Sequence, residues 1–158
     1  MHGDERGFFM ETWREDAWTA HGVPSAFVQD NHSRSRQGTV RGIHFQTHPG
    51  QGKLVRCARG AIVDVIVDLR PDSPTYCRAI DVELSPANRR FVYVPEGCAH
   101  GFQTLDPESE VIYFISEAYS PAAARGVRWN DPAFAIEWPK APARIMSDRD
   151  RSYPDFVR

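Results

Sequence analysis

The sequence predicts an all-β protein built as one antiparallel barrel or sandwich. Three observations lead to this class. Short runs of β-branched and aromatic residues recur along most of the chain, turn signals rich in glycine and proline separate them, and only one stretch suits a helix. Many short strands at such spacing favour antiparallel sheets over a doubly wound parallel sheet. We expect one domain over residues 1–158, because no repeat, low-complexity tract or linker divides the chain.

The N-terminal part carries the one expected helix. Phe8-Phe9-Met10 reads as a short strand, and Glu11–Ala20 contains no glycine or proline, so it predicts a helix that ends near His21-Gly22. Strand-like runs follow it. They cover residues 26–28, 39–46, 54–57, 61–69, 79–84, 90–94 and 111–115. The clearest strand, Ile62–Asp68, is apolar except for its aspartates, which predicts burial on both faces.

Turn residues separate these runs. They occur at Pro49-Gly50, Arg59-Gly60, Pro71-Asp72, Ser85-Pro86, Pro95-Glu96-Gly97 and Asp106-Pro107. After Pro121 the strand pattern ends. We expect the aromatic residues Trp129, Phe134 and Trp138 to pack this tail over the barrel.

The composition argues against several classes of function. A formal net charge of -2 gives no basic field that would recruit nucleic acid or an anionic membrane. No segment has the apolar core of a signal peptide or the length of a membrane span, so we expect a cytoplasmic protein. The cysteines Cys57, Cys77 and Cys98 are odd in number and form no CxxC pair. They therefore predict neither a disulfide framework nor a zinc site.

Two segments carry most of the chemistry-bearing residues. In the strand Arg41–Gln46, His44 and Gln46 point to the same face, because side chains alternate along a strand. The second segment, Pro95–Phe102, resembles the P-x-G-x-x-H half of the cupin signature. The resemblance implies a cupin-type antiparallel jelly-roll barrel with short helices at its ends. Since such a barrel holds its ligand in its mouth, we expect His44 and His100 to face one pocket.

The spacing of the ligands decides between metal and acid–base chemistry. A metal-binding cupin supplies an H-x-H pair and a carboxylate from the first segment, but here that segment reads His44-Phe45-Gln46. A single histidine in a closed pocket suits proton transfer, because histidine side chains in general titrate near neutral pH. We expect no metal and no cofactor. A metal-dependent oxygenase or isomerase with His44 and His100 as ligands remains the alternative.

Six short strings match the signatures of one known family, in order and over nearly the whole chain. They are Gly3–Phe9, Val28–Ser33, Arg41–Gln46, Gln51–Arg56, Pro95–Phe102 and Arg128–Pro132. In these strings the chain resembles the dTDP-4-dehydrorhamnose 3,5-epimerases. The resemblance implies a metal-free enzyme that inverts carbons next to the C4 ketone of a dTDP-4-keto-6-deoxy sugar, on the route to dTDP-L-rhamnose or a related deoxysugar. An inactive sugar-nucleotide-binding cupin is a further alternative.

The resemblance also implies catalytic roles. His44 matches the base that removes the proton next to the ketone, and Asp150 matches the aspartate that orients this base. Tyr113 matches the acid that returns a proton to the opposite face. Lys53 matches the residue beside the ketone oxygen, where a positive charge stabilises the enolate. Lys53 and Lys140 are the only lysines among 19 basic residues, so a lysine at position 53 is a specific choice.

Further residues match positions that bind the substrate. Arg6 and Arg41 resemble residues around the diphosphate, which guanidinium groups bind well. The remaining matches are Glu11, Gln29, Asn31, Gln46 and His100. In this family, residues before the Gly3–Arg6 motif help to join two subunits, so we expect a homodimer whose N-terminal part is either shortened or built differently.

Two substitutions depart from the family pattern. Phe114 stands where a lysine commonly follows the tyrosine, and on a strand its side chain points away from Tyr113. Cys98 stands where an aromatic residue is common. A smaller side chain there reshapes the pocket, so the sequence leaves open whether C3, C5 or both centres are inverted.

Overall fold

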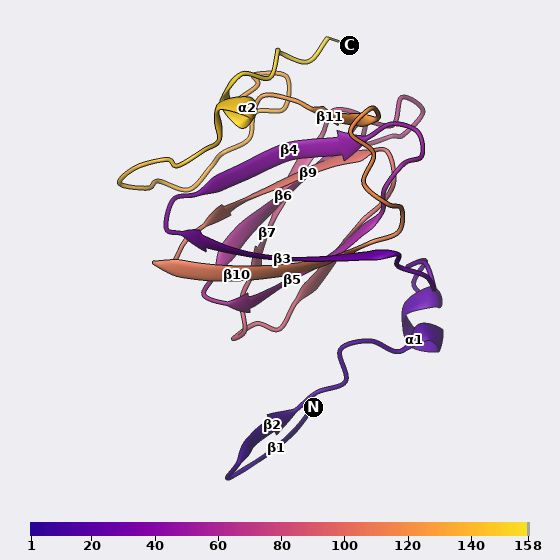
Figure 1. Ribbon diagram of the computed structural model, residues 1–158, viewed down its shortest axis with the longest axis vertical. Coiled ribbons are helices and arrows are strands. Elements are labelled where there is room, and N and C mark those ends of the chain that lie inside the picture. The colour runs from indigo at the N-terminus through magenta and orange to yellow at the C-terminus, as the bar shows by residue number, and fades with distance from the viewer. Residues whose placement is uncertain (158) are drawn as a thin grey trace.

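Two antiparallel sheets face each other in the computed structural model, which describes residues 1–157 (Figure 1). The first sheet has the strand order β3-β10-β5-β8 and the second the order β11-β4-β9-β6-β7. The strands of the first sheet are β3 (Gln29–Arg36), β5 (Lys53–Arg59), β8 (Phe91–Val94) and β10 (Glu108–Ile115). Those of the second are β4 (Val40–Gln46), β6 (Ile62–Asp68), β7 (Ala79–Leu84), β9 (Cys98–Thr104) and β11 (Ala124–Gly126). The chain passes repeatedly between the sheets, which confirms the all-β jelly roll.

The core lies on both sides of the second sheet. One apolar cluster fills the space between the sheets and includes Val55, Phe102 and Val111. A second cluster covers the outer face of the second sheet, where Phe134 and Trp138 of the tail pack with strand residues such as Val65. The expectation that the tail packs over the barrel is therefore correct for these two aromatics. Burial of β6 on both faces is confirmed as well, because strands β7 and β9 flank it and the two clusters cover it.

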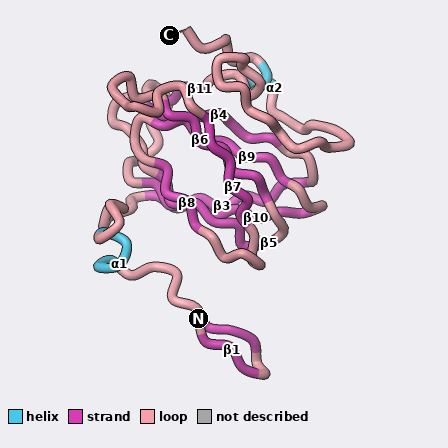
Figure 2. The backbone as a smooth tube through the Cα atoms, turned by 180° about the vertical axis from the view of Figure 1, so that it is seen from behind, coloured by secondary structure: helices cyan, strands magenta, loops and turns pink. Residues whose placement is uncertain are grey.

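The N-terminal arm, residues 1–14, stands apart from the sheets. Strands β1 (His2–Asp4) and β2 (Gly7–Phe9) form a hairpin that projects from the body in both views (Figures 1 and 2). Helix α1 (Glu15–Thr19) follows and is shorter than the predicted helix. Its N-cap residue, Arg14, has an extended backbone with φ -147° and ψ 123°, so the helix does not continue toward Glu11.

One strand prediction was wrong. Residues 26–28 are not a strand; instead β3 begins at Gln29 and runs through a polar stretch that has no apolar pattern. Its alternate residues are partly buried all the same, and the first two of them, Gln29 and Asn31, line the cavity between the sheets. Strand β1, strand β11 and the one-turn helix α2 (Asp148–Arg151) were also not predicted. No helix among residues 1–157 is long and apolar enough to cross a membrane.

Candidate active site

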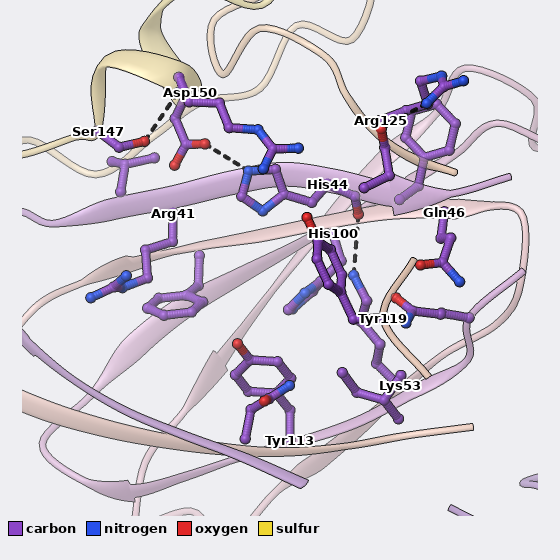
Figure 3. Close-up of a pocket in the computed structure, with 18 of the residues that line it drawn as sticks. Arg41, His44, Gln46, Lys53, His100, Tyr113, Tyr119, Arg125, Ser147 and Asp150 are labelled. Atoms are coloured by element: carbon purple, nitrogen blue, oxygen red, sulfur yellow. Dashed lines mark hydrogen bonds and ion pairs between the residues drawn. The ribbon is translucent and has the colours of Figure 1, made fainter. Parts of the chain in front are cut away.

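A cavity of about 560 Å³ opens between the two sheets at one end of the barrel (Figure 3). The first sheet and the second sheet both contribute to its walls, and the loop after β10 and the segment around α2 complete it. All the expected site residues except Arg6 and Glu11 line this cavity. They are Gln29, Asn31, Arg41, His44, Gln46, Lys53, His100, Tyr113 and Asp150.

His44 and Asp150 form a hydrogen-bonded pair on one wall. The distance from His44 Nε2 to Asp150 Oδ1 is 2.7 Å, and the Asp150 carboxylate is buried. Burial alone would raise the pKa of Asp150, but the hydrogen bond and the charge of His44, with backbone and Ser147 hydrogen bonds, hold it below its ordinary value. A carboxylate only accepts, so Nε2 carries a proton. In the neutral ring the other nitrogen, Nδ1, is therefore the free base, and it is turned toward the cavity (Figure 3).

Helix α2 delivers Asp150 to this pair. Ser147 caps the helix, because its Oγ accepts a hydrogen bond of 3.1 Å from the backbone N–H of Asp150. The backbone N–H of Gly42 also points at the carboxylate, 3.4 Å from Oδ2. Asp150 and His44 lie 106 residues apart in the sequence, so only the folded chain brings them together.

Tyr113 lies across the cavity from His44 (Figure 3). It comes from β10 in the first sheet, whereas His44 comes from β4 in the second. Burial raises the pKa of the Tyr113 hydroxyl, and the nearby charge of Arg41 only partly opposes this. The phenol is therefore protonated at neutral pH and can donate a proton. Phe114 turns to the other face and packs against Phe27, as expected for the next residue on a strand.

Lys53 and His100 stand between these two walls. The Lys53 ammonium donates a hydrogen bond of 3.2 Å to the backbone carbonyl of His44. Burial lowers the pKa of Lys53 to about 8, although the charge of Asp64 works in the opposite direction. The Nε2 of His100 lies 2.8 Å from Oδ2 of Asp64, a residue of β6 that is completely buried. This pair explains one aspartate in an otherwise apolar strand.

The remaining expected residues differ in how many of their polar atoms already form hydrogen bonds within the protein. Arg41 donates to Ser35 Oγ at 3.0 Å, and Gln29 donates to Asn31 at 3.1 Å. The buried amide of Gln46 is fully used by the protein itself. It donates to the carbonyls of Pro49 and Ala118 and accepts from the backbone N–H of Ser120. Gln46 therefore shapes the cavity by holding the loop after β10.

Arg6 and Glu11 lie on the N-terminal arm and do not line the cavity of their own chain. Arg6 is exposed and paired with Asp4, and Glu11 lies near Arg14. Other residues that line the cavity were not predicted from the sequence, among them Tyr119, Arg125 and Arg149. Tyr119 and Arg125 sit in irregular segments without a motif. The one signal in the sequence for Arg149 was its position next to Asp150.

The described residues 1–157 contain no group of three His, Cys, Asp or Glu side chains that could hold a metal ion. Instead, each cavity histidine pairs with one carboxylate. The arrangement can thus offer a base on one wall, an acid on the opposite wall, and a buried ammonium between them. Such a set can move a carbon-bound proton from one face of a planar intermediate to the other.

Comparisons with known proteins agree with this chemistry. The family model described as dTDP-4-dehydrorhamnose 3,5-epimerase matches residues 1–158. The dTDP-4-dehydrorhamnose 3,5-epimerase of Sinorhizobium fredii is 47% identical over 98% of this chain and 80% of its own length. A crystal structure of the Bacillus anthracis epimerase with TDP and PPi bound is 48% identical, with a TM-score of 0.93 over 98% of this chain and 89% of that one. A Legionella pneumophila epimerase in complex with dTDP-4-keto-L-rhamnose is 39% identical, with a TM-score of 0.91 over 94% of this chain and 80% of that one.

Proposed function

Since the chain belongs to the dTDP-4-dehydrorhamnose 3,5-epimerase family, we propose that it inverts its substrate with His44 as base and Tyr113 as acid. The protein is an isomerase that epimerises a dTDP-4-keto-6-deoxy sugar in deoxysugar biosynthesis. The observation that carries the proposed roles is the placement of His44 and Tyr113 on opposite walls of one cavity (Figure 3). Inversion needs two groups on opposite faces, because a single group tends to return the proton to the face it left.

The reaction then proceeds through an enolate. Nδ1 of His44 takes the proton from the carbon next to the C4 ketone. The electron pair of the broken C–H bond forms a double bond to C4, and the π pair of the ketone moves to its oxygen. Asp150 stabilises the imidazolium formed. Tyr113 gives its proton to the same carbon from the other side as the ketone re-forms. Solvent then returns a proton to Tyr113 and accepts one from His44, which is partly exposed.

Lys53 is proposed to stabilise the charge on the ketone oxygen. Its ammonium is buried at the back of the cavity, where little water screens its charge. His100 lies in the same cavity and is held in place by Asp64, so with both ring nitrogens protonated it can donate the N–H of its second nitrogen to the same oxygen. Positive groups at this oxygen stabilise the negative charge that develops on the enolate.

The diphosphate of the substrate is negatively charged, so a positively charged side chain is expected to bind it. Arg41 is exposed and lies at the cavity, which supports a role at the diphosphate. Gln29 and Asn31 line the cavity from β3 of the first sheet and can hydrogen-bond the substrate. Locating deuterium at C3, at C5 or at both after reaction in heavy water determines which centres are inverted.

We further propose a homodimer in which the N-terminal arm of one subunit reaches the cavity of the other. The arm hairpin pairs only with itself and leaves Phe8 and Phe9 65% and 71% exposed. Large apolar side chains on a projecting hairpin favour an interface. In that arrangement Arg6 and Glu11 would serve the partner subunit's cavity. The three free cysteines, all buried, support a cytoplasmic location.

Proton exchange in heavy water tests the base. The enzyme is incubated with dTDP-4-keto-6-deoxyglucose in D2O, and NMR locates deuterium at C3 and C5. We expect His44→Ala to lower the exchange rate by about a hundred- to ten-thousand-fold, because it removes a positioned base. Binding of dTDP, measured by calorimetry, should stay close to that of the parent. Exchange at the parent rate in the Ala variant would show that another group is the base.

A further inference from the structure

Tyr153 touches the proposed base without lining the cavity. Its ring lies edge-to-face against the His44 imidazole, with ring centroids 5.9 Å apart and planes inclined by 66°. Tyr153 follows α2 closely, in the same stretch as Asp150. One short segment therefore brings two groups to His44: a carboxylate that binds Nε2 and an aromatic ring that covers part of the imidazole.

The Tyr153 ring occupies the space that a side chain at Gly126 of β11 would need. Gly126 pairs directly with His44 across β11 and β4. A Cβ atom at position 126 would come within 2.4 Å of two Tyr153 ring atoms, and its three nearest neighbours all belong to that ring. The backbone of Gly126 does not have a positive φ. The ring, not the backbone, is therefore what excludes a side chain at this position.

Arg149 holds the outer end of the ring. Its Nε donates a hydrogen bond of 2.7 Å to the Tyr153 hydroxyl. The same guanidinium interacts with the hydroxyl of Tyr119, which lines the cavity from the loop after β10. Arg149 thus connects Tyr153 with the loop after β10. The ring therefore packs against Gly126 on one side, and its hydroxyl is bound by Arg149 on the other.

We propose that Tyr153 is a positioning residue that fixes the plane of the His44 imidazole and shields its hydrogen bond to Asp150 from water. The proposal rests on the role of His44 as base. The His44 side chain is 40% exposed, so without the ring a further part of the imidazole would face solvent. A hydrogen bond to a carboxylate is stronger where water is excluded. A base that is free to rotate also loses its alignment with the substrate carbon.

The geometry predicts a specific pattern among three variants. Tyr153→Ala and Gly126→Ala should each lower kcat by about 10- to 100-fold with little change in KM, because both remove the ring from the imidazole. The double variant should be no slower than Tyr153→Ala alone, since the added methyl group then meets no ring. Losses that multiply in the double variant, or parental kcat in Tyr153→Ala, would overturn the proposal.

Nuclear magnetic resonance gives a readout that does not depend on turnover. In protein labelled with 15N-histidine, the Nε2 proton of His44 should give a resolved signal, which is assigned by its absence in His44→Ala. We expect Tyr153→Ala and Gly126→Ala to broaden this signal through faster exchange with water. An unchanged signal in both would refute the shielding role. If His44→Ala kept full exchange activity, the base assignment would fail while this signal still tested the contact.

Two controls separate positioning from general loss of stability. Val127→Ala removes buried methyl groups from the neighbouring core position and destabilises the same region without touching His44. Well below its melting temperature it should keep the kcat and the His44 signal of the parent. Tyr153→Phe retains the ring and should recover most of the kcat lost in Tyr153→Ala. If Val127→Ala reproduced the defect, Tyr153 would have only a structural role.

Discussion

His44 and His100 each give one ring nitrogen to a buried aspartate, but their surroundings differ. His44 is partly open to solvent, so it can lose the abstracted proton between turnovers. His100 is 6% exposed and has completely buried Asp64 behind it. The pair in contact with solvent suits a base that must be reset, and the enclosed pair suits a group that is held in one position beside the ketone oxygen.

Replacement of Tyr113 by Phe tests the acid at the level of one hydroxyl group. The variant keeps the ring, so His44 and Lys53 can still form the enolate. Protonation on the inverting face should slow by about a hundred- to ten-thousand-fold. In heavy water we expect deuterium to enter recovered substrate of unchanged configuration faster than epimer appears. The ratio of exchange to inversion is measured by NMR. A ratio equal to that of the parent would mean that another donor supplies the proton.

The lowered pKa of Lys53 predicts the alkaline side of the pH profile. An ordinary lysine keeps its proton to about pH 10.5, but burial lowers the pKa of Lys53 to about 8. The stabilising ammonium is thus present below pH 8 and lost as the pH rises through that value. We expect kcat/KM, which reports the free enzyme, to fall above pH 8.

Lys53→Arg is the matched variant for this prediction. Arginine stays charged throughout the measurable range, so the alkaline fall should move upward even if the variant is slower. Tyr113 cannot account for a fall near pH 8, because burial moves its pKa above 10. If the alkaline limb of Lys53→Arg coincides with that of the parent, a different group controls it.

At the scale of elements, α2 matters more to the site than its single turn suggests. Its N-cap Ser147 holds the backbone of Asp150, and this residue in turn holds His44. Ser147→Ala removes the acceptor and should cost about 0.5–2 kcal/mol of stability, measured by urea unfolding. We expect kcat to fall as well, because the carboxylate loses its support. Ser147→Thr keeps a hydroxyl oxygen and serves as the control; equal losses in both variants would argue against the cap.

The elements that could be predicted from the sequence are those with an apolar side. Strands β6, β7 and β10 were found because residues such as Val65 and Val111 bury apolar groups. Strand β3 has no such pattern, and the first two of its inward residues line the cavity between the sheets. His44 and His100 were expected in one pocket because both belong to motifs. Tyr119 and Tyr153 belong to irregular segments, and only the tertiary structure brings them near His44.

At the scale of the whole molecule, the projecting arm makes the proposed dimer testable by complementation. Arg6→Ala and His44→Ala are each expected to be nearly inactive. In a mixed dimer, a subunit with intact His44 would receive an intact Arg6 from its partner, which restores one cavity. Random assembly of co-expressed subunits should therefore recover roughly one quarter of parental activity. This value applies to the unfractionated pool. The mixed dimer isolated with two different tags has one working cavity of two and should show roughly one half of parental activity per dimer.

The outcome distinguishes exchange of arms from a self-contained subunit. If Arg6 served its own chain, both cavities of the mixed dimer would be defective and no activity would return. Sedimentation analysis of each variant checks that both still assemble. A monomeric parent enzyme would contradict the dimer itself.

The separation of 106 residues between His44 and Asp150 also bears on how activity arises during folding. Contacts between distant parts of a chain form late, because closing a long loop costs entropy before the contact stabilises it. A growing chain on the ribosome carries its base long before the aspartate has been synthesised. The partly made protein therefore cannot begin enolising sugar nucleotides. In refolding, recovery of turnover will trail the optical signals of sheet formation, and that delay measures the docking of the last segment.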